Sequence, residues 1–282
     1  MAVRIFNNIT SLNAQRHLGI NNQRLAQSIE RVSSGLRINK AGDDVAGLAI
    51  SEKLRSDVRV LQQGLRNLND GLSMINVVEG ALNEQTDMII RMRELAAQSA
   101  SATIGDPERA LLQIEVDALI AEIDRFAAAT EFNGQPLLDG TLATFIVHFG
   151  LDATVNSQID LVAVGAIPPA PNGANSTALG VNAIDITTAA NAQAALTTLD
   201  TATDTVITIR AGTAAVQNRF TRIINTQATV IENLQAAESQ IRDADIAAEV
   251  ALLTRNQILV ESATAMVGQA NLIPQSVLQL LG

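Results

Sequence analysis

The feature that most constrains this chain is a pair of long stretches without proline, each carrying apolar residues at alternating steps of four and three. The six prolines are all confined to the remaining segments: Pro107, Pro136, Pro168, Pro169, Pro171 and Pro274. Since proline interrupts a helix, its absence from residues 1–106 and 172–273 permits long helices there. Apolar residues at four-three spacing form one stripe along a helix, which is typical of coiled-coil packing.

Each stretch carries one such seam. The front seam consists of Leu54, Val58, Leu61, Leu65, Leu68, Leu72 and Ile75. The rear seam consists of Val216, Phe220, Ile223, Gln227, Val230 and Leu234, with Gln227 as its one polar member. Each seam needs an apolar partner, and the nearest is the other seam. The sequence therefore predicts a mainly α fold, a long antiparallel helical or coiled-coil bundle built from the N- and C-terminal segments.

Between the seams the pattern changes several times. Asp43 is expected to cap a helix that ends near Gly105, and Asp106-Pro107-Glu108 has the residues that begin another helix. A period of two through Phe145, Val147 and Phe149, resumed at Ile159 and Leu161, predicts one small β-hairpin region. Residues 166–188 hold three prolines, together with glycine, asparagine and threonine, and are expected to form an exposed loop.

The two ends carry weaker stripes. Their apolar members are Leu18, Leu25, Ile29 and Val32 at the front and Leu259, Met266 and Ile273 at the rear. Asn22, Asn256, Ala263 and Ala270 interrupt them, and isolated helices of this length are marginal in water. We therefore expect these arms to be largely disordered in a monomer and to fold when copies associate.

Composition excludes several classes of function. The formal net charge is −10, with no basic cluster to neutralise a phosphate backbone, so no nucleic acid is expected as a partner. The chain has no cysteine, and its two histidines, His17 and His148, fall in different predicted elements. No catalytic, cofactor-binding or metal site is expected. There is neither an apolar run of membrane-spanning length nor a typical secretory signal, so membrane insertion is not expected and any export uses another route.

Motifs near both ends resemble those of the bacterial flagellin family. The front motifs are Ser33-Ser34-Gly35-Leu36-Arg37-Ile38-Asn39, Ala41-Gly42-Asp43-Asp44 and Gly47-Leu48-Ala49-Ile50-Ser51. The rear motifs are Asp243-Ala244-Asp245, Asn256-Gln257-Ile258-Leu259, Gln269-Ala270-Asn271, Pro274-Gln275-Ser276-Val277-Leu278 and Leu280-Leu281-Gly282. The chain departs modestly at Val45, where the family usually has alanine, and at Val250–Leu253, which is often more polar.

The resemblance implies a short flagellin with core domains only. Residues 1–42 and 246–282 would form the inner terminal helical domain. Residues 43–165 and 189–245 would form the helical rod with the hairpin, and 166–188 would replace the outer domains. The function implied is that of a structural subunit of the extracellular bacterial flagellar filament, not an enzyme. Its partners would be further copies of itself, the flagellar export apparatus, an export chaperone, and the hook-associated and cap proteins.

The resemblance also implies recognition by Toll-like receptor 5, through positions that match Arg91, Leu95 and Glu115. Packing between subunits is the alternative explanation for these three residues. Two other functions remain open: a hook–filament junction protein with the same helical ends, and, more distantly, an enzyme carried on a flagellin scaffold. The short middle segment and the absence of a zinc motif argue against the enzyme.

Overall fold

The computed structural model describes residues 7–169 and 173–281, with side chains described as far as Leu272. The helices are α1 (Ile9–Ser34), α2 (Val45–Ser99), α3 (Asp106–Ala129), α4 (Ala189–Arg242) and α5 (Ile246–Leu281). Two small antiparallel hairpins pair β1 (Glu131–Phe132) with β2 (Gln135–Pro136) and β3 (Ile146–His148) with β4 (Gln158–Asp160), and η1 (Val155–Ser157) precedes β4. The mainly α fold and the predicted hairpin are confirmed, and β1–β2 is an addition where only a turn was expected.

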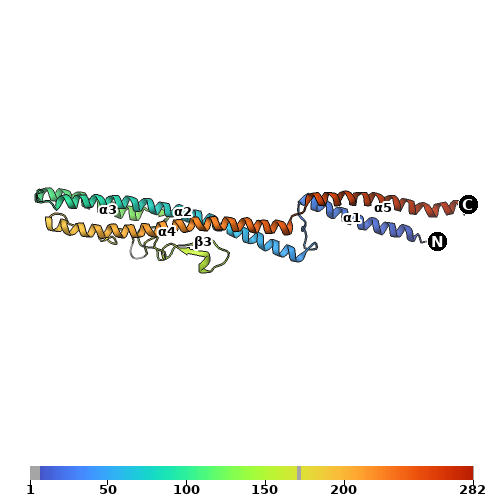
Figure 1. Cartoon of the computed structure of the whole chain (residues 1–282), viewed down its shortest axis with the longest axis horizontal. Coiled ribbons are helices and arrows are strands. Elements are labelled where there is room, and N and C mark those ends of the chain that lie inside the picture. Colours follow the sequence, from blue (N-terminus) through green and yellow to red (C-terminus); the bar gives the residue numbers. More distant parts are fainter. Residues whose placement is uncertain (1–6, 170–172, 282) are drawn as a thin grey trace. The chain divides into compact units, whose positions relative to one another are not determined.

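The chain divides into two compact units (Figure 1). The terminal unit comprises Met1–Val58 and Glu232–Gly282, and the central unit comprises Arg59–Ile231. Helices α2 and α4 therefore contribute residues to both. The division predicted from the family resemblance places its boundaries elsewhere and stays a prediction.

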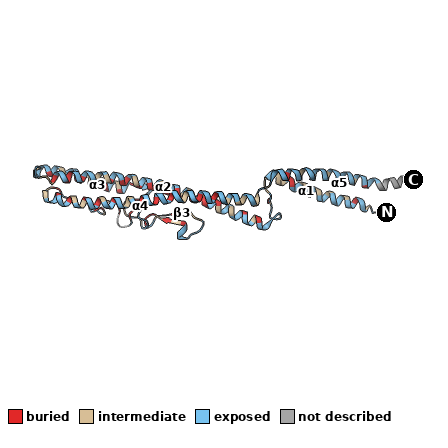
Figure 2. Ribbon diagram, in the orientation of Figure 1, coloured by how far each residue is buried: buried red, intermediate tan, exposed pale blue. Residues whose placement is uncertain are grey.

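The central unit holds the hydrophobic core, where the buried colouring of Figure 2 is concentrated. Phe220 of α4 is fully buried, and a Cβ on Gly71 of α2 would lie 2.8 Å from its ring. On the other flank of α2, Val116 and Ile123 of α3 are buried in the same core. The absence of a side chain at Gly71 thus lets α4 pack closely on α2.

Arg109 fixes the turn from α2 into α3. Its side chain is almost fully buried, and its guanidinium donates to the carbonyl oxygens of Ser99 at 2.8 Å and Ser101 at 3.0 Å. The carboxylate of Asp106 lies 2.8 Å from the same group. Because the last carbonyls of a helix lack partners within it, this arginine satisfies the end of α2 from the start of α3.

The residues that begin the helices differ slightly from prediction. Asp44, not Asp43, caps α2, since its Oδ1 accepts from the backbone N–H of Gly47 at 2.9 Å. Asp43 instead accepts from the backbone N–H groups of Asn39 and Lys40. Gly105 is the cap residue of α3, with proline in the first turn as expected.

The structure contradicts the prediction that residues 166–188 form an exposed loop. Ala166, Ile167, Ala174, Leu179, Val181, Ile184 and Ile186 of this segment are buried in the core. Hydrogen bonds fasten it as well: Ser99 Oγ donates to the carbonyl of Ile186, and Ser176 Oγ donates to Asp124 at 2.8 Å. Proline and glycine set its irregular backbone, but its aliphatic side chains cover the α2–α3–α4 core.

The two predicted seams lie where α2 meets α4. Val58, Leu61, Leu68, Ile75 and Phe220 are buried, and Leu54, Leu65, Leu72, Ile223 and Leu234 are half-buried. Val230 is the exception, because it is 40% exposed while its neighbour Ile231 is buried. A helix turns slightly less than a strict four-three repeat assumes, so the buried stripe passes from Gln227 to Ile231.

Candidate association surface

Polar side chains hold α1 against α5 in the terminal unit. Ser11 Oγ donates to Asn271 Oδ1 at 2.7 Å, and Asn256 Nδ2 donates to Ser28 Oγ at 3.0 Å. Ser11 and Ser28 are buried, and Asn8 Nδ2 donates to the carbonyl of Ala270 at 2.8 Å. The interface between the two terminal helices is therefore hydrogen-bonded along its length.

Apolar residues occupy the positions between these polar contacts. On α1 they are Leu18, Leu25 and Val32, all half-buried, and on α5 they are Leu253, Val260 and Val267. The stripes predicted from the sequence do not include Ser11, Ser28 or these three α5 residues. Extending the four-three steps from Leu18 and Leu25 would have reached Ser11 and Ser28, but a search for apolar residues passes over serine.

Other predicted arm residues point away from this interface. Ile29 is 50% exposed and Met266 is 63% exposed, and Leu259 is also exposed. The side chain of Ile273 lies outside the described residues. The α1–α5 pair thus buries small and polar side chains and leaves several of its largest apolar ones in solvent.

The terminal unit as a whole shows the same pattern, with polar side chains buried and large apolar side chains exposed. Among the described residues its buried hydrophobic side chains are Ile38, Val58 and Ala270, and all the others belong to the central unit. Its exposed large hydrophobic residues, which we call the outward apolar set, are Ile9, Leu12, Ile20, Ile29, Val45, Ile50, Ile246, Val250, Leu252, Ile258, Leu259, Met266 and Leu272. So much exposed apolar surface on helices with so little core is typical of a surface that another molecule covers.

Short backbone contacts join the two connections inside the terminal unit. Gly35 ends α1 with a φ of 72°, which suits glycine, and its carbonyl accepts from the N–H of Ala244 at 2.9 Å. The N–H of Arg37 donates to the carbonyl of Arg242 at 2.7 Å. The Arg242 guanidinium lies 2.7 Å from Glu52 of α2. Residues 35–44 and 242–245 are therefore fastened to each other and to the start of α2.

Asp43 organises the turn before α2. Its Oδ2 accepts from the backbone N–H groups of Lys40 at 3.0 Å and Asn39 at 3.1 Å. These hydrogen bonds favour the ionised carboxylate and lower the pKa of Asp43. The Asp43 side chain thus acts as an anionic anchor for the turn.

The three residues considered for receptor contact do not share one environment. Arg91 Nε donates to Glu115 Oε1 at 2.8 Å, and both side chains are exposed. Leu95 is only 1% exposed and belongs to the core. The structure therefore brings Arg91 and Glu115 together on the surface and places Leu95 beneath it.

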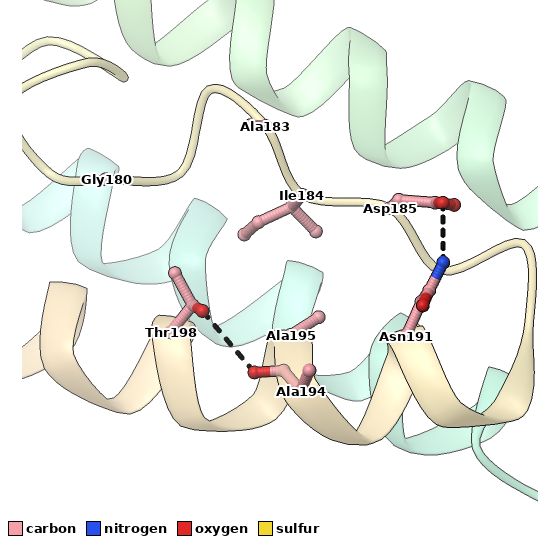
Figure 3. A pocket seen from close by; sticks show the side chains of 8 residues that line it. All are labelled: Gly180, Ala183, Ile184, Asp185, Asn191, Ala194, Ala195 and Thr198. Atoms are coloured by element: carbon pink, nitrogen blue, oxygen red, sulfur yellow. Dashed lines mark hydrogen bonds between the residues drawn. The ribbon is translucent and has the colours of Figure 1, made fainter.

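The hollows of the central unit offer little chemistry. The one in Figure 3 has a volume of about 310 Å³ and is lined mainly by aliphatic and small residues, with Asp185, Asn191 and Thr198 as polar members. Asp185 accepts from Asn191 at 2.7 Å, and hydrogen bonds from Thr187 lower the pKa of its carboxyl group. This carboxylate is therefore already bonded and ionised, which does not suit a general acid.

No helix in the described part of the chain is both long and apolar enough to cross a membrane. In residues 7–169 and 173–281 no cluster of histidine and acidic side chains could hold a metal ion.

Comparisons with known proteins agree with this picture. Residues 5–143 match the bacterial flagellin N-terminal helical region, and residues 196–281 match the bacterial flagellin C-terminal helical region. A flagellin of Halalkalibacterium halodurans is 44% identical over 277 residues, covering 98% of this chain and 99% of that protein. The flagellar filament 30.7 kDa core protein of Treponema maltophilum is 42% identical over 284 residues, with the same coverage of both chains.

One solved structure is similar in fold alone. A putative flagellar hook-associated protein from Vibrio parahaemolyticus superposes with a TM-score of 0.51 at 14% identity, covering 71% of this chain and all of that one.

Proposed function

The chain belongs to the bacterial flagellin family, and we propose that its outward apolar set is the surface through which copies join into the filament. It is a structural subunit of the extracellular flagellar filament rather than an enzyme, and it associates with itself. The observation that supports the proposed surface is the inversion of the terminal unit, where polar residues are buried and large apolar residues are exposed.

The physical reason is that the free energy gained by burying apolar surface must exceed the free energy lost when the chain is ordered. Burying apolar surface stabilises a structure by roughly 25 cal/mol per Å², whereas ordering each residue costs about 1–2 kcal/mol. The α1–α5 pair gains little from its own interface, because its large apolar side chains are only half-buried and the buried Ser11 and Ser28 are polar. Copies that cover the outward apolar set supply the missing burial, so the two ends become fully ordered only in the polymer.

Seeded growth tests this proposal. Purified full-length chain added to short filament fragments should extend them. Replacing Leu12 and Met266 by serine should weaken the filament, raising the concentration of unpolymerised chain at steady state at least tenfold. The matched control is Val155→Ser, which removes an apolar side chain that is 77% exposed in the central unit and should leave growth unchanged. Equal growth of the double variant and the wild type would refute the proposed surface.

The same experiment separates the remaining alternative. A hook–filament junction protein would add to an end and stop, whereas a filament subunit continues to extend it. The similarity to a hook-associated protein concerns the fold only. Continued extension is the outcome we expect.

Other partners follow from family membership and belong to the proposal. They are the flagellar export apparatus, an export chaperone, and the hook-associated and cap proteins. Residues 1–42 and 246–282 are proposed as the inner domain, and 43–165 with 189–245 as the surrounding helical domain.

Recognition by Toll-like receptor 5 is proposed through the exposed Arg91–Glu115 pair. Leu95, being buried, would act by holding α2 in place rather than by contact. A receptor reporter assay should respond to the monomer and lose most of the response when Arg91 is replaced by glutamate.

A further inference from the structure

Methionine is the side chain of this protein that mild oxidants attack most readily. The sequence has five methionines and no cysteine, tryptophan or tyrosine. Oxidants add one oxygen atom to the thioether sulfur of methionine and so convert an apolar side chain into a polar one. Because the oxidant must reach the sulfur, the solvent exposure of each methionine decides which of them reacts in the folded chain.

The methionines differ sharply in exposure. Met74 and Met92 of α2 are buried in the core of the central unit, and Met88 is half-buried against the same core. Met266 of α5 is 63% exposed, and it is the one exposed methionine among the residues whose side chains the structure describes. Met1 lies outside those residues. Within the described chain, an oxidant should therefore reach the Met266 sulfur first.

The surroundings of Met266 explain why its sulfur is uncovered. The residues one turn before and one turn after it on α5 are small or polar: Ser262, Ala263, Gln269 and Ala270. Ala270 is buried and the adjacent Val267 is half-buried, so the seam with α1 passes beside Met266 without covering it. The sulfur is accessible in a folded α5, and unfolding of this helix in the monomer would expose it further.

Met266 also belongs to a regular row within the outward apolar set. Leu252, Leu259 and Met266 follow one another at steps of seven residues, so they lie on one side of α5 and are spaced about 10 Å apart. All three are exposed, and Met266 is the most exposed of them. Since a seven-residue repeat of large apolar side chains is the pattern by which helices associate, this row suits packing against another copy.

We propose that Met266 is a redox-sensitive modification site, at which oxidation hinders addition of the chain to a filament. This inference rests on the proposed function and assigns a chemical regulation to the same surface. With a peroxide as the oxidant, the Met266 sulfur takes one oxygen atom and becomes a sulfoxide. The S–O bond forms as the O–O bond breaks, the sulfur loses two electrons, and hydrogen peroxide is reduced to water.

The sulfoxide changes association more than it changes the fold of one copy. Its oxygen accepts hydrogen bonds from water, and these are lost when a second copy covers the side chain. The single chain is little affected because Met266 is exposed in it. In the filament the covered sulfur reacts slowly, so oxidation stops new chains from joining and spares those already joined. Methionine sulfoxide reductases reverse the change.

Peroxide treatment of the purified monomer, followed by removal of the peroxide with catalase, tests the proposal. Peptide mass spectrometry should show the added oxygen at Met266 first, at Met88 later, and at Met74 and Met92 only after unfolding. In seeded growth, the oxidised chain should leave about five times more unpolymerised chain at steady state than the untreated chain. Treatment with both sulfoxide reductases, one for each sulfoxide epimer, should restore growth.

Two variants assign the effect to one sulfur. Met266→Leu keeps a large apolar side chain that peroxide does not oxidise, and Met88→Leu removes the half-buried methionine of the central unit. Each variant is compared with its own untreated sample. Peroxide should not alter growth of Met266→Leu, and it should reduce growth of Met88→Leu as much as growth of the wild type. If Met266→Leu fails to polymerise, reductase rescue of the oxidised wild type decides the question.

The filament provides a test that does not depend on growth. Peroxide added to finished filaments should oxidise Met266 roughly ten times more slowly than peroxide added to the monomer, because a neighbouring copy covers the sulfur. Equal rates in monomer and filament would overturn the inference.

The remaining outcomes are distinct. If untreated wild-type chain does not extend seeds, the proposed function fails. If it does, and chain that carries the Met266 sulfoxide extends seeds equally well, only the redox inference is overturned. The redox inference also falls if treated Met266→Leu loses growth as the wild type does, or if the reductases remove the sulfoxide and growth does not return.

Discussion

At the scale of single residues, two glycines show how closely α2 is approached in the central unit. A Cβ on Gly64 would lie 2.2 Å from the carbonyl oxygen of Phe149 and 2.8 Å from Gln227 Nε2, and Gly71 meets the Phe220 ring. Glycine in a helix costs about 1 kcal/mol relative to alanine. The hairpin and α4 approach α2 so closely at Gly64 and Gly71 that a larger side chain would clash, which explains why α2 has glycine at these two positions.

Gly64→Ala should therefore destabilise the chain, by about 1–3 kcal/mol, because the hairpin must move away from α2. Gly80→Ala on the same helix is the matched control, since nothing lies within 4 Å of its Cβ position. That change should stabilise by about 0.5–1 kcal/mol. Thermal unfolding of the two variants would give opposite shifts in Tm, and shifts of the same sign would contradict this account of Gly64.

The hydrogen bonds of Asp43 predict that the turn before α2 is sensitive to acid. Its hydrogen bonds to Lys40 and Asn39 lower its pKa in the folded chain. The contribution of Asp43 to the stability of the turn is therefore present above the unfolded pKa of about 4 and is lost as pH falls through the lower folded pKa. The protection of the Lys40 amide, which is its exchange rate compared with the intrinsic rate at the same pH, should fall over that acid range. In Asp43→Asn the exchange should already be faster at neutral pH and show no such step, and an unchanged step would point to another group.

At the scale of elements, the sequence predicted the helices well and their surroundings less well. The absence of proline and the four-three spacing gave α2 and α4, and alternation at Val147 and Ile159 gave the hairpin. The burial of 166–188 was missed because proline and glycine indicate irregular backbone and say nothing of where Ile167 or Val181 lies. The α1–α5 seam was only half found, because Ser11 and Ser28 are polar.

The polar α1–α5 seam leads to a prediction of its own. Asn256→Leu replaces an amide that bonds Ser28 with an apolar side chain at a seam position, where asparagine lowers coiled-coil stability. We expect amide protection in α1 and α5 of the monomer to rise about tenfold. The exposed Gln257→Leu is the control and should change little, and equal or lower protection in Asn256→Leu would show that the seam does not limit the stability of the pair.

At the scale of the whole molecule, the two units have opposite balances of burial. The central unit keeps a continuous apolar core, whereas the terminal unit leaves its outward apolar set in solvent. This contrast is why we expect one part of the chain to be stable alone and the other to depend on neighbouring copies. The sequence suggested this dependence through its interrupted stripes, but which side chains face outward required the structure.

Hydrogen exchange measured by mass spectrometry on monomer and on filament tests this claim most directly. We predict that α1 and α5 exchange rapidly in the monomer and slowly in the filament, while the buried stretches of α2, α3 and α4 within the central unit are protected in both. Strong protection of α1 and α5 in the monomer, equal to that in the filament, would contradict the account.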